Sequence, residues 1–125
     1  MKNKKALQEI VLSKEQVDSV ITLYSSGKIN EAIVAIKALN ESYPNVPLLF
    51  NVLGACYLKL GQTDAAEKMF TTAVAIKPDY AEAHFNLGFA LKDAGKTNLA
   101  VESYRKAIGL LPNYPVAHNN LGSAL

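Results

Sequence analysis

The sequence predicts an all-α fold, a solenoid built from antiparallel helix pairs. Residues that interrupt helices recur every 34 positions, as Pro44, Pro78 and Pro112 show. Between them, apolar residues follow the i, i+3, i+4, i+7 spacing of a buried helix face, and the alternation typical of strands is absent. A fixed period of this length is typical of stacked helical repeats.

Residues of very different chemistry keep this interval, which excludes a chance recurrence. Three units therefore span residues 13–46, 47–80 and 81–114, and residues 115–125 form the first helix of a truncated fourth, an ending that suggests a piece of a longer protein. The recurring residues are Gly27, Gly61 and Gly95; Ala32, Ala66 and Ala100; Ile36, Phe70 and Tyr104; and Leu53-Gly54, Leu87-Gly88 and Leu121-Gly122.

Residues 1–12 precede the first unit and form a basic segment that could be a short helix. Lys2, Lys4 and Lys5 are interpreted as a solvated terminus, with anchoring to a surface as the alternative. Ser13 and Gln16 have the spacing of a capping box, which predicts that the first helix of the first unit begins there.

Each unit is expected to contain a helix, a tight turn and a second helix. The first helix should end at the glycine, because glycine readily adopts the left-handed conformation that closes a helix. The second helix should begin three residues later at Asn30, Asp64 or Asn98, whose side chain could accept an unpaired backbone N–H. The proline then prevents the helix from continuing.

Small residues are expected to bring the two helices of a unit close together. Gly54 would face Ala66, and Gly88 would face Ala100. Enlarging such a position, as in Ala66→Leu, should unfold the middle unit through overpacking.

These residues resemble the tetratricopeptide repeat family, whose pattern is an aromatic, Leu-Gly and Tyr on the first helix, Ala and Phe on the second, and a closing Pro. The resemblance implies a right-handed superhelix. The second unit carries the whole pattern, the third carries it with His84 and Leu91 at two positions, and the first conforms only in its second helix. The matching residues are Phe50, Leu53-Gly54, Tyr57, Ala66, Phe70 and Pro78, then His84, Leu87-Gly88, Leu91, Ala100, Tyr104 and Pro112, and in the first unit Ala32, Ile36 and Pro44.

The resemblance also implies a concave groove, formed by the first helices, that binds an extended peptide or a helix. Transferred to this chain, the groove-lining residues include Ile21, Tyr24, Leu48, Asn51, Val52, Ala55, Lys59, Phe85, Asn86, Phe89, Lys92, Asn119 and Asn120.

Asn86 and Asn120 occupy equivalent positions in this groove. A primary amide can donate to a backbone carbonyl and accept from a backbone N–H, so it can hold a peptide without reading its sequence. The pair resembles the asparagine ladder in the repeats of O-linked N-acetylglucosamine transferases. The alternative is that both asparagines are ordinary solvated residues.

The groove is also more apolar than a solvated surface requires, through Ile21, Leu48, Val52, Phe85 and Phe89. An exposed apolar patch usually marks a contact, so we expect an external peptide or helix. Burial by neighbouring repeats and cover from Leu7, Ile10 and Val11 at the chain's own start are the alternatives.

Members of the family that bind chaperones hold a terminal carboxylate with cations. The matching sites here are Val17, Ile21, Val52, Glu82 and Asn86, or one repeat along Asn51, Ala55, Asn86, Val116 and Asn120. Neither set contains a cation, which argues against that class of partner.

Composition excludes several other functions. The net charge is +2, which gives no basic surface for nucleic acid, and no apolar stretch is long enough to cross a membrane. The single Cys56 cannot form an internal disulfide, so we expect a core thiol and a cytoplasmic, reducing location.

No catalytic motif or cofactor site is expected. His84 and His118 stand one repeat apart, too far for one metal ion, and are interpreted as packing residues. The leading hypothesis is a non-catalytic module that binds other proteins. The alternatives are the targeting region of a larger transferase and a module that self-associates through the groove or the last helix.

Overall fold

The computed structural model describes residues 12–125, so the basic start of the chain lies outside the described residues. The described residues form seven α-helices and no strand, which confirms the all-α prediction. The helices are α2 (Lys14–Ser25), α3 (Ile29–Ser42), α4 (Pro47–Lys59), α5 (Thr63–Ile76), α6 (Ala81–Asp93), α7 (Thr97–Leu110) and α8 (Pro115–Ala124).

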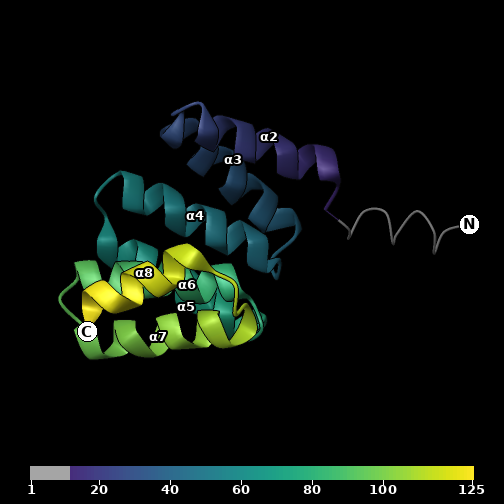
Figure 1. Ribbon diagram of the computed structural model, residues 1–125. Coiled ribbons are helices and arrows are strands. Elements are labelled where there is room, and N and C mark those ends of the chain that lie inside the picture. Colours follow the sequence, from purple (N-terminus) through teal and green to yellow (C-terminus); the bar gives the residue numbers. More distant parts are fainter. Residues whose placement is uncertain (1–11) are drawn as a thin grey trace, which may run out of the picture.

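The helices form three pairs and one single helix. Helix α2 packs on α3, α4 on α5 and α6 on α7, and α8 lies against α6 and α7. Figure 1 shows α2 and α3 at one end of the stack and α6, α7 and α8 at the other. Helices α4, α6 and α8 begin at Pro47, Ala81 and Pro115, positions related by the sequence period. Of these first helices, α4 contacts α6, and α6 contacts α8.

The turn inside each pair is made by a glycine in the left-handed conformation. Gly27, Gly61 and Gly95 have φ angles of 80°, 73° and 82°, as the sequence predicted. The N–H of the residue after each glycine returns to the first helix; Gln62, for example, donates to the Tyr57 carbonyl at 2.9 Å. These bonds pair carbonyls that the helix end would otherwise leave unpaired.

The expectation that Asn30, Asp64 and Asn98 cap the second helices is wrong. Helices α3, α5 and α7 begin one residue earlier, and no side chain caps them. The residue after each glycine is already the N-cap, because its N–H is bonded to the preceding helix and its carbonyl accepts the first bond of the next. The turn is thus too short for a separate capping residue.

Ser13 does cap α2, as predicted. Its hydroxyl accepts a hydrogen bond from the Gln16 N–H at 3.1 Å, and its own N–H donates to the Gln16 side chain at 3.0 Å. This reciprocal arrangement is the expected capping box.

The core consists of three clusters along the stack. The first is mainly aliphatic, with Val20, Ile36, Leu49 and Leu53. In the second and third, one buried aromatic ring, Phe70 or Tyr104, lies against a small alanine, Ala66 or Ala100. A Cβ placed on Gly54 would lie 2.5 Å from the Phe70 ring, and one on Gly88 would lie 2.7 Å from the Tyr104 ring. These glycines admit an aromatic ring against the backbone, so the neighbours of Gly54 and Gly88 across each helix pair are Phe70 and Tyr104.

Candidate functional site

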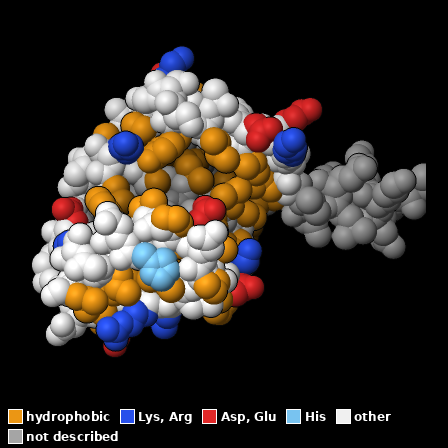
Figure 2. Space-filling view, in the orientation of Figure 1, with side chains coloured by type: hydrophobic (Ala, Val, Ile, Leu, Met, Phe, Trp, Pro, Cys, Tyr) orange, Lys and Arg blue, Asp and Glu red, His pale blue; other side chains and the backbone are white. Residues whose placement is uncertain are grey.

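Side chains from α2, α4, α6 and α8 surround a cavity of about 550 Å³ on the face made by the first helices. Figure 2 shows hydrophobic side chains gathered around a hollow over α4. Phe85, Asn86 and Phe89 share one face of α6, because residues three and four apart are neighbours on a helix. The lining residues, which we call the groove, are Tyr24, Ala55, Leu58, Lys59, Phe85, Asn86, Phe89, Val116 and Asn120.

Seven of the thirteen residues that the sequence assigned to the groove lie together in it: Tyr24, Ala55, Lys59, Phe85, Asn86, Phe89 and Asn120. The other six lie outside this lining. Asn51 is buried, Leu48 and Val52 are half-buried, and Ile21, Lys92 and Asn119 are exposed.

Asn51 lies beneath Asn86 and connects it to the loop before α6. The Asn86 amide donates to the Asn51 oxygen at 2.9 Å, and the Asn51 amide donates to the Tyr80 hydroxyl at 3.3 Å. Asn51 is only 6% exposed, so it fixes the orientation of Asn86 and does not face the groove itself. As the amides are oriented here, Asn86 keeps its oxygen and one N–H for another partner.

The two phenylalanines of the groove differ in how tightly they are held. Phe85 packs against two tyrosine rings, with centroid distances of 5.8 Å to Tyr104 and 5.3 Å to Tyr114. Phe89, in contrast, is 48% exposed. The groove therefore has a fixed aromatic wall and one ring free to contact a partner.

Tyrosine hydroxyls around the groove stay protonated at neutral pH. Burial raises the pKa of Tyr24, with a smaller contribution from nearby Cys56, and burial also raises the pKa of Tyr104 and Tyr114. The Tyr104 hydroxyl has no hydrogen-bond partner of good geometry among the described residues, although the neighbouring Asn120 amide partly offsets the rise in its pKa. These tyrosines therefore add no charge beside the groove at neutral pH.

Lys59 supplies the only charge among the lining residues. The groove is thus largely apolar, with two amides and one cation, an arrangement that suits a peptide better than a highly charged ligand.

Leu58 and Val116 line the groove although the sequence did not assign them to it. The 34-residue period could have identified Leu58, because Tyr24 lies one period before it on α2. Val116 likewise lies one period after Glu82. No repeat in the sequence could have predicted the hydrogen bond from Asn51 to Tyr80. This bond depends on how the loop before α6 folds over α4.

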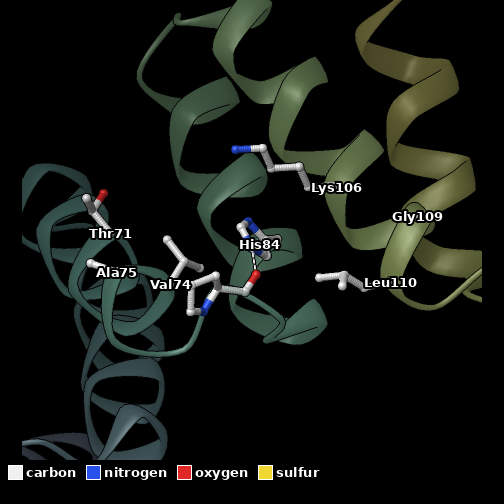
Figure 3. Close-up of a pocket in the computed structure, with 8 residues that line it drawn as sticks. Thr71, Val74, Ala75, His84, Lys106, Gly109 and Leu110 are labelled. Atoms are coloured by element: carbon white, nitrogen blue, oxygen red, sulfur yellow. Dashed lines mark hydrogen bonds between the residues drawn. The ribbon is translucent and has the colours of Figure 1, made fainter.

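A second depression of about 590 Å³ lies between the second helices α5 and α7, with Val74, Lys106 and Leu110 around it. Figure 3 shows His84 at its centre, bonded to the Pro78 carbonyl. The His84 Nε2 donates to this carbonyl at 2.7 Å, and His118 makes the equivalent bond to Pro112 at 2.9 Å. Each histidine therefore ties the start of a first helix to the proline turn before it.

In residues 12–125 no three metal-ligating side chains gather into a group that could hold an ion. None of the helices described there has the length and apolar character needed to span a membrane. Cys56 is completely buried, which fits the expected core thiol.

Comparison with known proteins gives both family and structural matches. A family model for the TPR repeat matches residues 54–95 and 90–125. The human aspartyl/asparaginyl beta-hydroxylase is 30% identical over 66 residues, which are 53% of this chain and 9% of the hydroxylase. The chain thus spans a small part of that curated relative.

Two solved structures share the fold closely. The first TPR of Spaghetti (RPAP3), bound to the HSP90 peptide SRMEEVD, is 25% identical with a TM-score of 0.85, and the match covers 92% of this chain and 94% of that one. The O-GlcNAc transferase of Thermobaculum terrenum, in a mutant form, is 26% identical with a TM-score of 0.78. That match covers 91% of this chain and 23% of the transferase.

Proposed function

Because the chain belongs to the tetratricopeptide repeat family, we propose that it is a non-catalytic module whose groove binds a peptide or helix of another protein. The observation that carries this proposal is the half-exposed Phe89 ring beside Asn86 and Asn120 in one cavity. An exposed ring beside amides that still have free hydrogen-bonding groups can bury apolar surface and form new hydrogen bonds when a ligand covers it.

The groove suggests how such a ligand is held. Asn86 and Asn120 would bond to its main chain, while Leu58, Phe89 and Val116 would contact its apolar side chains. Lys59 would favour an acidic residue on the ligand. Asn51 would contribute indirectly, by holding Asn86 in place.

The related RPAP3 domain supports peptide binding, since its structure contains an HSP90 peptide. The positions in this chain that would carry a carboxylate-binding cation are Val17, Ile21, Val52, Glu82 and Asn86, or one repeat along Asn51, Ala55, Asn86, Val116 and Asn120. None of these positions holds a lysine or an arginine. We therefore propose that the ligand is bound along its length and not through a terminal carboxylate.

The first prediction tests this groove. A peptide selected from a phage-displayed library against the full chain should bind the N86A/F89A double variant at least about tenfold more weakly, because it loses an amide contact and a ring contact. Isothermal titration calorimetry measures the affinity.

Leu99→Ala is the matched control, because Leu99 is 51% exposed on α7 and lies outside the groove. Equal affinity of the double variant and the wild type would contradict the proposal. So would a loss caused by Leu99→Ala alone.

A second candidate function is the targeting region of a larger transferase. The similarity to part of an O-GlcNAc transferase favours it, because there a related array occupies a fraction of an enzyme. The reading frame of the parent gene distinguishes the two, since an additional transferase domain would support the second. Self-association is the third candidate, and light scattering across a concentration series tests it.

A further inference from the structure

A hollow between the second helices α5 and α7 shares no lining residue with the groove. Two cavities, of about 590 Å³ and 250 Å³, adjoin there and have Thr71, Val74, His84 and Lys106 in common. We call the space that these four residues line the furrow. In Figure 3 the His84 ring lies in its middle, with Val74 from α5 and Lys106 from α7 around it.

The furrow is open because three residues around it are smaller than their counterparts one period earlier. These are His84, Ser103 and Gly109, which stand where the preceding unit has Phe50, Met69 and Ala75. Met69 packs against the first core cluster, so it fills space between α5 and the preceding pair. Ser103 holds the same place on α7 but is too short to do so. The furrow is therefore particular to the contact between the second and third pairs.

The His84 ring brings an unused acceptor to the furrow. Its Nε2 donates to the Pro78 carbonyl at 2.7 Å, so the other nitrogen, Nδ1, carries the lone pair. This Nδ1 is buried and has no hydrogen-bond partner among the described residues, and His84 as a whole is only 6% exposed. A buried acceptor without a donor costs free energy, which a donor on a ligand would recover.

The rest of the furrow is apolar, with one cation at its edge. Leu87 and Leu91 of α6 lie at its base, and Leu99 and Leu110 of α7 stand at its two ends, 51% and 43% exposed. Lys106 is exposed between these two leucines and forms no ion pair with a described residue. The furrow thus offers contacts for an apolar group, a hydrogen-bond donor and an acid.

We propose that the furrow binds an extended segment of another protein, which inserts a tryptophan or tyrosine over His84 and places an acidic residue beside Lys106. An aromatic ring replaces the bulk that Phe50 and Met69 supply one unit earlier, and its N–H or O–H can donate to Nδ1. Neighbouring residues of an extended segment point to opposite sides, so one enters the furrow while the next faces the rim.

A second copy of the chain does not supply this segment. The chain has no tryptophan, and Asp79-Tyr80 is its only tyrosine with an acidic neighbour in the sequence. The Tyr80 hydroxyl already accepts a hydrogen bond from Asn51, and Tyr80 immediately precedes α6. The occupant is therefore a different protein.

The spacing of the rim leucines sets the length of a probe. Leu99 and Leu110 lie 11 positions apart on one helix, which is about 16 Å. Five extended residues span about this distance. The probe is the capped pentapeptide Leu-Ser-Trp-Asp-Leu, whose first, third and fifth side chains face the furrow. Serine at the second place avoids repulsion from Glu102, which lies one turn before Lys106.

Nuclear magnetic resonance titration of the isotope-labelled full chain measures both the affinity and the place of binding. The pentapeptide should saturate one-to-one and shift the signals of Val74, His84 and Leu110, while those of Asn86 and Phe89 stay unchanged. A peptide with a methyl group on the indole nitrogen should bind at least about tenfold more weakly, because it has lost the donor. Lysine in place of the aspartate should weaken binding by a similar factor.

Gly109→Leu should weaken pentapeptide binding at least about tenfold, because its side chain occupies the furrow. The variant should fold normally, since a Cβ at this glycine meets nothing within 4 Å. The matched control is Gly122→Leu, an exposed helical glycine with the same open space but outside the furrow. Ser103→Met, which copies Met69 of the preceding unit, should also block the site.

Four results would overturn the proposal. The first is a wild-type chain that does not bind the pentapeptide, and the second is equal binding of the peptide with the methylated indole. The third is binding that Gly109→Leu leaves unchanged. The fourth is a capped Trp-Asp dipeptide that binds as tightly as the pentapeptide, because a small molecule would then suffice. The N86A/F89A variant should bind the pentapeptide normally, so failure here is distinct from failure of the groove.

Discussion

At the scale of single residues, the packing depends on matched volumes across each helix pair. Gly54 accepts the Phe70 ring and Gly88 accepts the Tyr104 ring, both rings being fully buried. In the first pair, valine (Val20) stands at the glycine position and isoleucine (Ile36) at the aromatic position, and both side chains are buried. Cores tolerate such exchanges when the total volume is conserved. The degenerate first repeat therefore keeps the fold, because a larger residue on its first helix faces a smaller one on its second.

This matching predicts the effect of one added methyl group. Gly88→Ala should lower the free energy of unfolding by about 1–3 kcal/mol, because the Cβ meets a buried tyrosine ring that has no room to move. Urea denaturation followed by circular dichroism measures the change.

Gly109→Ala serves as the control for backbone effects. Its Cβ meets open space on α7, so the substitution should be neutral or should stabilise by up to about 1 kcal/mol. If both variants lost the same stability, steric contact with Tyr104 would not be the reason for glycine at position 88.

The residue scale also shows how much of the site the sequence predicts. Helical periodicity is enough to place Phe85, Asn86 and Phe89 on one face, and the structure brings them together in the groove. It is not enough to show that Asn51 is buried. That depends on two hydrogen bonds to residues 29 and 35 positions away, which no local pattern encodes.

At the scale of helices, the ends are better predicted than the beginnings. The glycines have the left-handed backbone that the sequence requires of them, and α3, α5 and α7 stop two residues before Pro44, Pro78 and Pro112. The beginnings of these three helices were misplaced, because propensity suggested a capping Asn or Asp where the glycine turn had already supplied the N-cap. Asp64 lies in the first turn of α5, where an acidic side chain interacts favourably with the helix dipole.

Helix α2 is the exception, since a side chain does cap it. Ser13→Ala should destabilise the protein by about 1 kcal/mol, because the Gln16 N–H loses its acceptor. Thermal denaturation measures this loss.

Ser19→Ala is the comparison within the same helix. Ser19 is exposed in the interior of α2, where alanine is the better helix former. The melting temperature of this variant should be unchanged or slightly higher. A similar fall for both substitutions would mean that the capping box contributes nothing to stability.

At the scale of the whole molecule, the sequence period was sufficient to predict an all-α solenoid, because no single helix pair buries its apolar faces alone. Helices α4 and α6 each contact a partner on two sides, and α8 has one side covered. The curvature that creates the groove follows from how successive pairs rotate, which depends on side-chain fit at each interface and not on the period.

The buried tyrosines predict how the whole stack responds to alkaline pH. Burial raises the pKa of Tyr24, Tyr80, Tyr104 and Tyr114 above the ordinary value of 10.0. The unfolded chain therefore loses these protons first, so the stabilisation is intact below pH 10 and is lost as pH rises through the higher pKa values of the folded state. The urea midpoint should fall above pH 10, together with the appearance of tyrosinate absorbance.

Tyr104→Phe provides the control for this prediction. It removes a hydroxyl that has no hydrogen-bond partner of good geometry among the described residues and leaves the ring that packs on Gly88. The variant should fold at neutral pH and lose less stability under alkaline conditions. An alkaline fall identical to that of the wild type would show that Tyr104 ionisation does not contribute.

Among residues 12–125, the substantial contacts of each helix are with helices next to it or one further along the stack. An in-frame gain or loss of one 34-residue unit would therefore preserve the type of every remaining interface. The number of repeats can then change by gene duplication or deletion with little loss of folding stability. Each such change would lengthen or shorten the surface available to other proteins, and that difference would be inherited.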